Sequence, residues 1–316
     1  MSSPVTQTQS RIQPRSGLER TIDKGFIWIT RIFALAIAGV LIWIAFEVAI
    51  EALPAIQAFG GNFFVSTAWN PVKQVYGVLP MVYGTVVTSA IALLIAVPVG
   101  LGVSVFLSED YLPPKMQVPL VFLVELLAAI PSVVYGLWGI YVLIPILTKL
   151  GQGLNAYFGW LPIFSTPPSG PGVFPAGVIL SIMILPTIAA ISRDALISLP
   201  SDLRQAAVGL GATRWETILK VLLPAAFSGI VGAVMLALGR AIGETMAVTM
   251  VIGNSNRISP SILAPGNTIP SLLANQFAEA SGLQVAALMY AALILFGITL
   301  IVNILAQLLV LRVQRI

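Results

Sequence analysis

The segment QAAVGLGATRWETILKVLLP, residues 205–224, is a polar stretch between long apolar ones. Of the 316 residues in the chain, 58% are apolar and 9% are charged, whereas a soluble domain carries about 25% charged residues. We expect a chain of this composition to be embedded in a lipid bilayer. Lipid offers backbone groups no water partner, so we expect helical spans. We therefore expect residues 205–224 to lie outside the membrane, where they contact something in the cytosol.

The composition excludes several kinds of chemistry. The chain contains no Cys and no His, which excludes disulfides, thiolate chemistry, Cys/His zinc sites and axial haem ligands. None of its lysines follows a glycine, so there is no P-loop and no ATPase. A membrane-embedded enzyme is a competing class, but the cytosolic acids Asp194, Asp202 and Glu216 are dispersed rather than clustered. We predict no catalytic residue, no bound metal and no cofactor in this chain.

Six apolar segments are long enough to cross about 30 Å of hydrocarbon. They are residues 32–50, 78–107, 118–147, 173–191, 222–252 and 285–311. Alternating ten-residue strands are absent, which argues against a barrel. Pro98 and Pro131 predict a kink or a break in the second and third segments. The expected fold is an all-α polytopic membrane protein with six transmembrane helices.

The basic residues predict the orientation of these spans. With both termini in the cytosol, twelve Lys and Arg residues lie inside and only Lys73, Lys149 and Arg257 lie outside. Splitting the third segment at Pro131 would move the basic cluster of residues 193–220 outside and break this rule. Because the basic residues are spread over loops, the net charge of +4 indicates topology rather than nucleic-acid binding.

The remaining segments are terminal tails and outer loops. We predict that residues 1–25 are a retained cytosolic tail and that residues 312–316 are also cytosolic. Residues 51–77, 150–172 and 254–284 are turn-rich outer loops, the last containing a short apolar stretch at 271–280. These loops either only connect the spans or also form a binding surface for an extracytoplasmic partner.

The polar stretch has the signals of two short helices. After Leu199 and Pro200, Ser201 and Asp202 are N-cap candidates for a helix of small residues at 203–208. Gly209 and Gly211 predict a turn. Thr213 is a candidate cap for a second helix, and Pro224 marks the entry to the next span. The pattern predicts a helix–turn–helix elbow parallel to the membrane, serving either to dock a partner or only to orient the spans.

The spacing within this elbow resembles the Glu-Ala-Ala loop of importer-type ABC transporter permeases, which docks on the ATPase subunit. Gln205 stands where Glu is usual and Val221 where Ile is usual. The resemblance implies a type I ABC importer permease fold with a coupling loop at residues 199–224. The residues it assigns to ATPase coupling are Gln205, Ala206, Ala207, Gly211, Arg214, Trp215 and Glu216.

Four further stretches, residues 125–136, 185–187, 193–196 and 237–247, resemble the C-type subunit of phosphate-specific permeases, and the likeness covers about residues 75–311. It implies a permease domain at 75–311, preceded by a first transmembrane helix and outer loop at 26–74. It also implies a plasma (inner) membrane location and three kinds of protein partner. These are a second permease subunit, two ATPase subunits that bind ATP and Mg, and a periplasmic or secreted phosphate-binding protein.

Two charges lie within the fifth apolar segment. A lone charge at mid-bilayer costs about 2.5–3.5 kcal/mol on insertion scales, so Arg240 and Glu244 require an explanation. Their spacing of four predicts one helical face, and the adjacent Gly239 and Gly243 allow close approach of a helix or an anion. Either the two form a structural salt bridge between helices, or Arg240 contacts the substrate in transit or gates it while Glu244 modulates Arg240.

Glu125 lies in the third segment, and its candidate ion-pair partners are Lys115, Arg193 and Arg240. Glu125 either has a structural role as one half of such a pair or takes part in the transport path. Two other functions compete with phosphate import. One is a permease for sulfate or molybdate. Most of the discrimination between such oxyanions would lie in the binding protein, so the permease sequence separates them only by resemblance. The other is a transporter or channel that runs without ATP, but the chain shows no half-length repeat and the elbow would then have no purpose.

Overall fold

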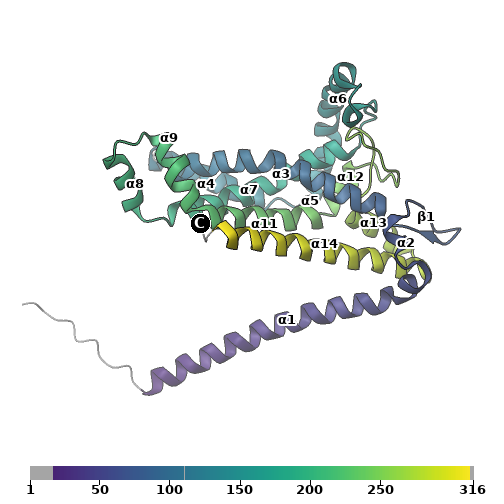
Figure 1. Ribbon diagram of the computed structural model, residues 1–316, viewed down its shortest axis with the longest axis horizontal. Helices are drawn as coiled ribbons and strands as arrows, with labels where there is room; N and C mark the ends of the chain where they lie inside the picture. The colour runs from purple at the N-terminus through teal and green to yellow at the C-terminus, as the bar shows by residue number, and fades with distance from the viewer. Residues whose placement is uncertain (1–16, 110, 314–316) are drawn as a thin grey trace, which may run out of the picture. The chain divides into compact units, whose positions relative to one another are not determined.

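The computed structural model describes residues 17–109 and 111–313, and Figure 1 shows how its elements follow one another. Most of the predicted tail at 1–25 and most of 312–316 lie outside these residues. The chain divides into two units, residues 1–50 and 51–316. Within the described residues the architecture is helical, with one small antiparallel pair, β1 (Trp69–Asn70) and β2 (Val75–Tyr76).

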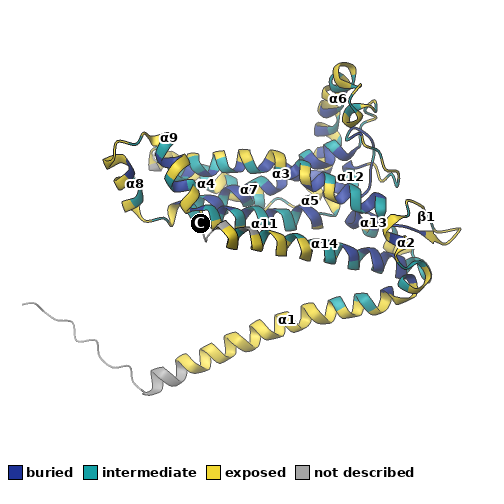
Figure 2. Ribbon diagram, in the orientation of Figure 1, coloured by how far each residue is buried: buried dark blue, intermediate teal, exposed yellow. Residues whose placement is uncertain are grey.

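The first unit consists of the N-terminal part of helix α1 (Gly17–Phe59). The described side chains of this part are exposed almost throughout, as the yellow ribbon in Figure 2 shows. Phe26, Phe33 and Trp43 are 70%, 66% and 71% exposed, although the helix is strongly apolar. Exposed apolar side chains on every face are typical of a helix surrounded by lipid or by another membrane helix.

The second unit is built around four long helices: α3 (Leu79–Ser108), α7 (Val173–Ile197), α11 (Phe227–Gly243) and α14 (Leu283–Val313). They lie side by side, with α7 contacting α3 and α11, and α11 contacting α14 (Figure 1). The short helices α8 (Ser201–Gly209) and α9 (Arg214–Thr217) lie at one end of this bundle. Helices α6 (Ile144–Phe158) and α13 (Ile269–Gln276) lie at the other end.

Small residues determine how α3 packs. Every fourth residue of α3 from 84 to 104 is small and buried, namely Gly84, Thr88, Ala92, Ala96, Gly100 and Ser104. Residues four apart share one helical face, so this face lets another backbone approach closely. A methyl group on Gly100 would meet the side chain of Ile188 in α7 at 2.9 Å. The helix continues through Pro98, where the sequence predicts a kink or a break.

The third apolar segment is broken at the predicted proline. Its pieces are α4 (Pro114–Ala128), α5 (Ser132–Trp138), a π-helical turn η1 (Gly139–Leu143) and α6 (Ile144–Phe158). Pro131 cannot donate a backbone hydrogen bond. The Tyr135 hydroxyl donates to the carbonyl of Leu127 at 2.9 Å, which also accepts from the backbone N–H of Ile130 at 3.4 Å. The helix long enough to span is Ser132–Phe158, so the predicted span at 118–147 is placed too early in the sequence.

The fifth segment, predicted as one span at 222–252, is broken twice. After η3 (Ile218–Leu222) and α10 (Leu223–Ala225), the chain bends by 70° at Ala226 into α11. Helix α11 ends at Gly243, and α12 (Met246–Val251) follows after two non-helical residues. Among the described residues, five helices are long and apolar enough to cross a membrane, or six if the bent pair forms one span.

The segments that the sequence predicts as outer loops are more ordered than expected. They contain α2 (Asn62–Val65), η2 (Pro162–Phe164), α13 (Ile269–Gln276) and η4 (Phe277–Glu279), with α13 covering much of the predicted apolar stretch. The loop before α13 is largely buried from residue 261 onward. The backbone N–H groups of Val173 and Phe174 donate to the carbonyls of Ala264 (3.1 Å) and Ile262 (2.8 Å), which fixes this loop on the start of α7.

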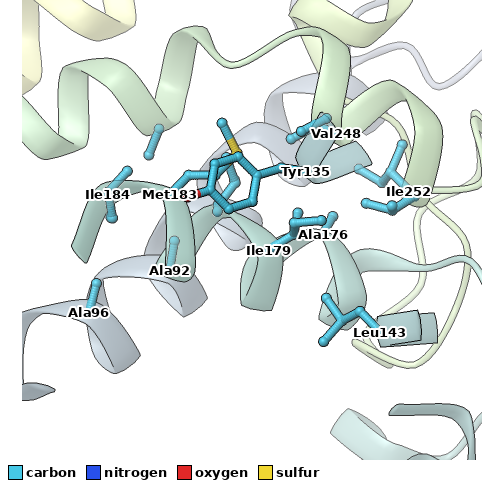
Figure 3. Packing of buried hydrophobic residues seen from close by; sticks show 14 of the residues in the cluster. Ala92, Ala96, Tyr135, Leu143, Ala176, Ile179, Met183, Ile184, Val248 and Ile252 are labelled. Carbon is cyan, nitrogen blue, oxygen red and sulfur yellow. The ribbon is translucent and has the colours of Figure 1, made fainter. Parts of the chain in front are cut away.

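The main core lies where α3, α5, α7 and α12 meet. Figure 3 shows the ring of Tyr135 from α5 beside Met183 of α7, with Ile179 and Val248 nearby. Tyr135 is 6% exposed and Met183 is 1% exposed. This packing holds the short helices α5 and α12 against α7 close to the break that follows α11.

Candidate coupling elbow and translocation site

The elbow predicted from the sequence forms two short helices. Helix α8 (Ser201–Gly209) and helix α9 (Arg214–Thr217) are joined by a turn. Gly211 in this turn has φ +84°, a left-handed conformation that favours glycine. Pro200 occupies the N-cap position of α8, so the predicted caps Ser201 and Asp202 lie inside its first turn instead.

The start of α9 is fixed by a capping box, which confirms Thr213 as the predicted cap. The backbone N–H of Glu216 donates to Thr213 Oγ1 at 3.3 Å, and the backbone N–H of Thr213 donates to Glu216 Oε2 at 3.0 Å. Lys220 Nζ donates to Glu216 Oε1 at 3.2 Å. The bonds from Thr213, followed by that from Lys220, lower the pKa of Glu216 to about 2.

The surface of the elbow presents most of the residues assigned to coupling. Gln205, Ala206, Gly211, Arg214 and Trp215 are exposed, Glu216 is half-buried, and Ala207 is buried. A shallow hollow of about 320 Å³ lies over the turn, lined by Ala207, Leu210, Gly211, Ala212, Glu216, Lys220 and Val221. Small side chains beside a hollow and an exposed Trp suit the docking of another protein.

The return of the elbow is packed against the bundle. Ile218 and Leu222 of η3 form a buried cluster with Leu196 at the end of α7 and with Ala226 and Ile230 after the elbow. Leu101 and Val105 of α3 pack against this cluster. The elbow is therefore held by apolar contacts at the ends of both α3 and α7.

Beyond the 70° bend, the elbow continues into the helix that carries Arg240 in its last turn. One face of α11 is buried, through Ala233, Ala237 and Ala241. The opposite face carries Gly232, Leu236, Gly239 and Gly243, and a methyl group added to any of these glycines would meet nothing within 4 Å. Leu236 is 62% exposed. This uncovered face is open to another helix.

Arg240 lies beside the uncovered face, because it follows Leu236 by four residues and precedes Gly243 by three. It is half-buried, and its guanidinium is within electrostatic reach of the Tyr135 hydroxyl. Among the residues that the structure describes, no acidic side chain forms an ion pair with Arg240. Its planar set of donors is therefore not committed to a carboxylate.

The prediction that Arg240 and Glu244 lie on one helical face is wrong. Helix α11 ends at Gly243, and Glu244 has an extended backbone (φ −67°, ψ 124°), so the four-residue spacing does not stack the two side chains. The Glu244 carboxylate accepts a hydrogen bond from the backbone N–H of Ala247 at 3.2 Å, in the first turn of α12. Its observed contact is with the start of the next helix.

Glu125 lies on α4, is exposed, and lines a small cavity with Arg193 of α7. Within the described part of the chain, it forms no ion pair with Lys115, Arg193 or Arg240, the three partners considered from the sequence. Arg193 Nη1 pairs with the neighbouring Asp194 at 3.2 Å, and its Nε is buried without a hydrogen-bond partner.

Sequence reasoning missed an ion pair at the elbow. Arg204 of α8 forms an ion pair with Glu109, the residue after α3, at 3.0 Å. The two residues are 95 positions apart, so no local sequence pattern indicates that they meet.

Comparison with solved structures gives the fold. A bacterial ABC transporter involved in the import of the acidic polysaccharide alginate matches with a TM-score of 0.59 at 16% identity, covering 94% of this chain and 99% of that chain. The methionine ABC transporter MetNI, in an inward-facing conformation, matches with a TM-score of 0.53 at 19% identity, covering 75% and 94%. The fold is that of an importer permease.

Comparison with curated sequences gives closer relatives. A protein named phosphate transport system permease protein PstC in Xylella fastidiosa is 45% identical over 266 residues, covering 83% of this chain and 82% of the relative. The protein of that name in Pasteurella multocida is 43% identical over 299 residues, covering 93% of each. The family described as binding-protein-dependent transport system inner membrane component matches residues 96–315. This chain belongs to that family of inner-membrane transport components.

Proposed function

We propose that this chain is a permease subunit of an ATP-driven ABC importer that carries inorganic phosphate inward across the plasma (inner) membrane. One observation carries this proposal. An exposed elbow of small residues continues through a 70° bend into the helix that bears Arg240, which has no acidic partner among the described residues. Movement of a protein bound to the elbow would displace the helix that holds this cation. The names of the PstC relatives support phosphate as the substrate.

Arg240 would contact phosphate in transit. The guanidinium is planar and offers paired N–H donors that match two oxygens of an oxyanion. A single Arg at the edge of a helix face binds an anion weakly, which suits passage better than storage. In this proposal Glu244 does not neutralise Arg240 but fixes the start of α12, and Glu125 keeps a structural role on α4.

Each partner has a distinct place in this proposal. A second permease subunit would cover the glycine-rich face of α11 and complete the path around Arg240. Two ATPase subunits, which bind ATP and Mg, would dock on the elbows through Gln205, Ala206 and their neighbours. A periplasmic or secreted phosphate-binding protein would deliver the anion at the opposite end of the bundle. Both termini would lie in the cytosol, with residues 1–25 as a tail, and the chain itself would catalyse no reaction.

Uptake of radiolabelled phosphate at low micromolar concentration tests the proposal. Cells lacking this chain should lose high-affinity uptake, and the wild-type chain should restore it. Sulfate and molybdate uptake, measured in the same cells, serve as controls for the related oxyanions. Unchanged phosphate uptake together with lost sulfate or molybdate uptake would overturn phosphate as the substrate. Uptake that persists in cells lacking the ATPase subunits would overturn the ATP-driven mechanism.

A further inference from the structure

Polar contacts made by Arg204 link α8 to the bundle. Arg204 Nε and Nη2 both donate to Oε1 of Glu109, at 3.2 and 3.0 Å. Nη2 also donates to the carbonyl of Leu196 in the last turn of α7, at 3.1 Å. One guanidinium therefore bridges the elbow, the end of α3 and the end of α7.

This bridge lies beside open space instead of dense packing. A cavity of about 200 Å³ separates α8 from the segment that follows α3, and Arg204, Val208 and Ile218 are among its lining residues. The side chains of Arg204 and Glu109 are 28% and 18% exposed, so the pair is partly shielded from water. Apolar contacts hold the return of the elbow, whereas α8 itself depends more on these polar contacts.

A second contact strengthens the link. The Arg214 guanidinium of α9 lies 5.7 Å from the ring centroid of Tyr111, in the segment between α3 and α4. This distance is within the range of a cation–π interaction. Both arms of the elbow therefore contact the segment after α3, one through Glu109 and the other through Tyr111.

We propose that Glu109 and Arg204 are positioning residues that fasten the elbow to α3 and α7, so that force applied by the ATPase moves these helices together with α11. The inference rests on the proposed function, because it assumes that an ATPase docks on the elbow. Without the pair, α8 would shift into the adjacent cavity when pushed, and part of the movement would not reach the bundle.

The mobility of α8 tests the physical link without any transport assay. Because the chain has no Cys, a Ser201→Cys substitution gives a single attachment point for a nitroxide spin label at an exposed position of α8. In the complete transporter in lipid nanodiscs, Glu109→Gln and Arg204→Gln should each raise the label mobility. The double variant should be no more mobile than either single one, because the two residues act as one unit.

Coupling is measured on the same complexes reconstituted in vesicles with the binding protein. Each single variant should raise the ATP hydrolysed per phosphate imported by about threefold, and the double variant should match them. Arg204→Lys keeps the charge but loses the planar set of donors, so an intermediate ratio is expected. Asp194→Asn is the matched control, because it removes an ion pair between adjacent residues without linking two helices, and it should leave both readouts unchanged.

Two results would overturn the inference. The first is label mobility in the Glu109 and Arg204 variants equal to that of the control. The second is additive effects of the two substitutions on the ATP-to-phosphate ratio. If the proposed function itself fails, the wild-type transporter shows no phosphate import, while the spin-label comparison still reports on the link. If a Gln variant does not assemble, Arg204→Lys provides both readouts.

Discussion

The carboxylate of Glu244 accepts a hydrogen bond from the backbone N–H of Ala247 at 3.2 Å, on the far side of a helix break from Arg240. Free N–H groups at the start of a helix favour a carboxylate there. Glu244 is thus committed to the start of α12, whereas Arg240 has no acidic partner among the described residues. The two charges have separate roles despite their short spacing in the sequence.

Replacing Arg240 with Gln should abolish phosphate uptake, a loss of about tenfold or more, because an anion in transit would lose charge-assisted hydrogen bonds. Uptake of radiolabelled phosphate measures the effect, and copurification of the second permease and the ATPase measures assembly. Arg257→Gln, at an exposed outer-loop position, is the control and should leave both intact. Loss of assembly in Arg240→Gln would favour a structural role for Arg240.

Replacing Glu244 with Gln should preserve most uptake, because the amide oxygen can still accept the hydrogen bond from Ala247. Glu244→Ala should instead destabilise the start of α12 by about 0.5–2 kcal/mol, the usual cost of removing a helix cap. Thermal unfolding in detergent and phosphate uptake measure the two effects. If Glu244→Gln lowers uptake as strongly as Arg240→Gln at unchanged stability, the charge of Glu244 acts on transport after all.

Replacing Ala206 with Phe should prevent the ATPase from copurifying, because Ala206 is exposed on the elbow and a large ring would block close docking. The variant should still fold, since Ala206 is exposed and is not part of the buried cluster at the return of the elbow. Ser201→Phe, on another face of α8, is the matched control and should retain the ATPase. Normal copurification with Ala206→Phe would place the docking surface elsewhere.

The capping box of α9 should resist mild acid. Hydrogen bonds lower the pKa of Glu216 to about 2, so its contribution is present above the ordinary carboxyl value of 4.5 and is lost as the pH falls toward 2. A spin label at Leu210→Cys should keep constant mobility from neutral pH down to about 4.5 and become more mobile below it. In a Thr213→Ala variant, the same label should be more mobile than in the chain with Thr213 at every pH. A mobility change near neutral pH in the wild-type chain would contradict this assignment.

Replacing Gly84 with Ala should destabilise the end of the bundle that lies next to α13. Its added methyl group would collide with the carbonyl oxygen of Asn267, in the buried loop before α13. Overpacking of this kind costs about 1–3 kcal/mol. Gly102→Ala, in the same helix but with nothing within 4 Å of the added methyl group, should be neutral or slightly stabilising. Equal thermal unfolding temperatures for the two variants would rule out the close contact.

Properties that depend on neighbouring residues could be predicted from the sequence alone. The length of an apolar run is a local quantity, so the helical membrane fold and the approximate places of most spans follow from it. The break at Pro131 and the cap at Thr213 also follow, because a missing N–H and a Thr three residues before Glu act within one helical turn.

Only the tertiary structure decided what depends on distant contacts. Helix α11 ends at Gly243 although residues 225–252 contain no proline, and α12 beyond the break packs in one buried cluster with α5 and α7. That break separates Arg240 from Glu244, which local spacing alone would pair. The bond between Glu109 and Arg204 likewise exists because the bundle brings the ends of α3 and α8 together, and its two residues are 95 positions apart. Such a contact is set by the packing of whole helices, which no short window of sequence contains.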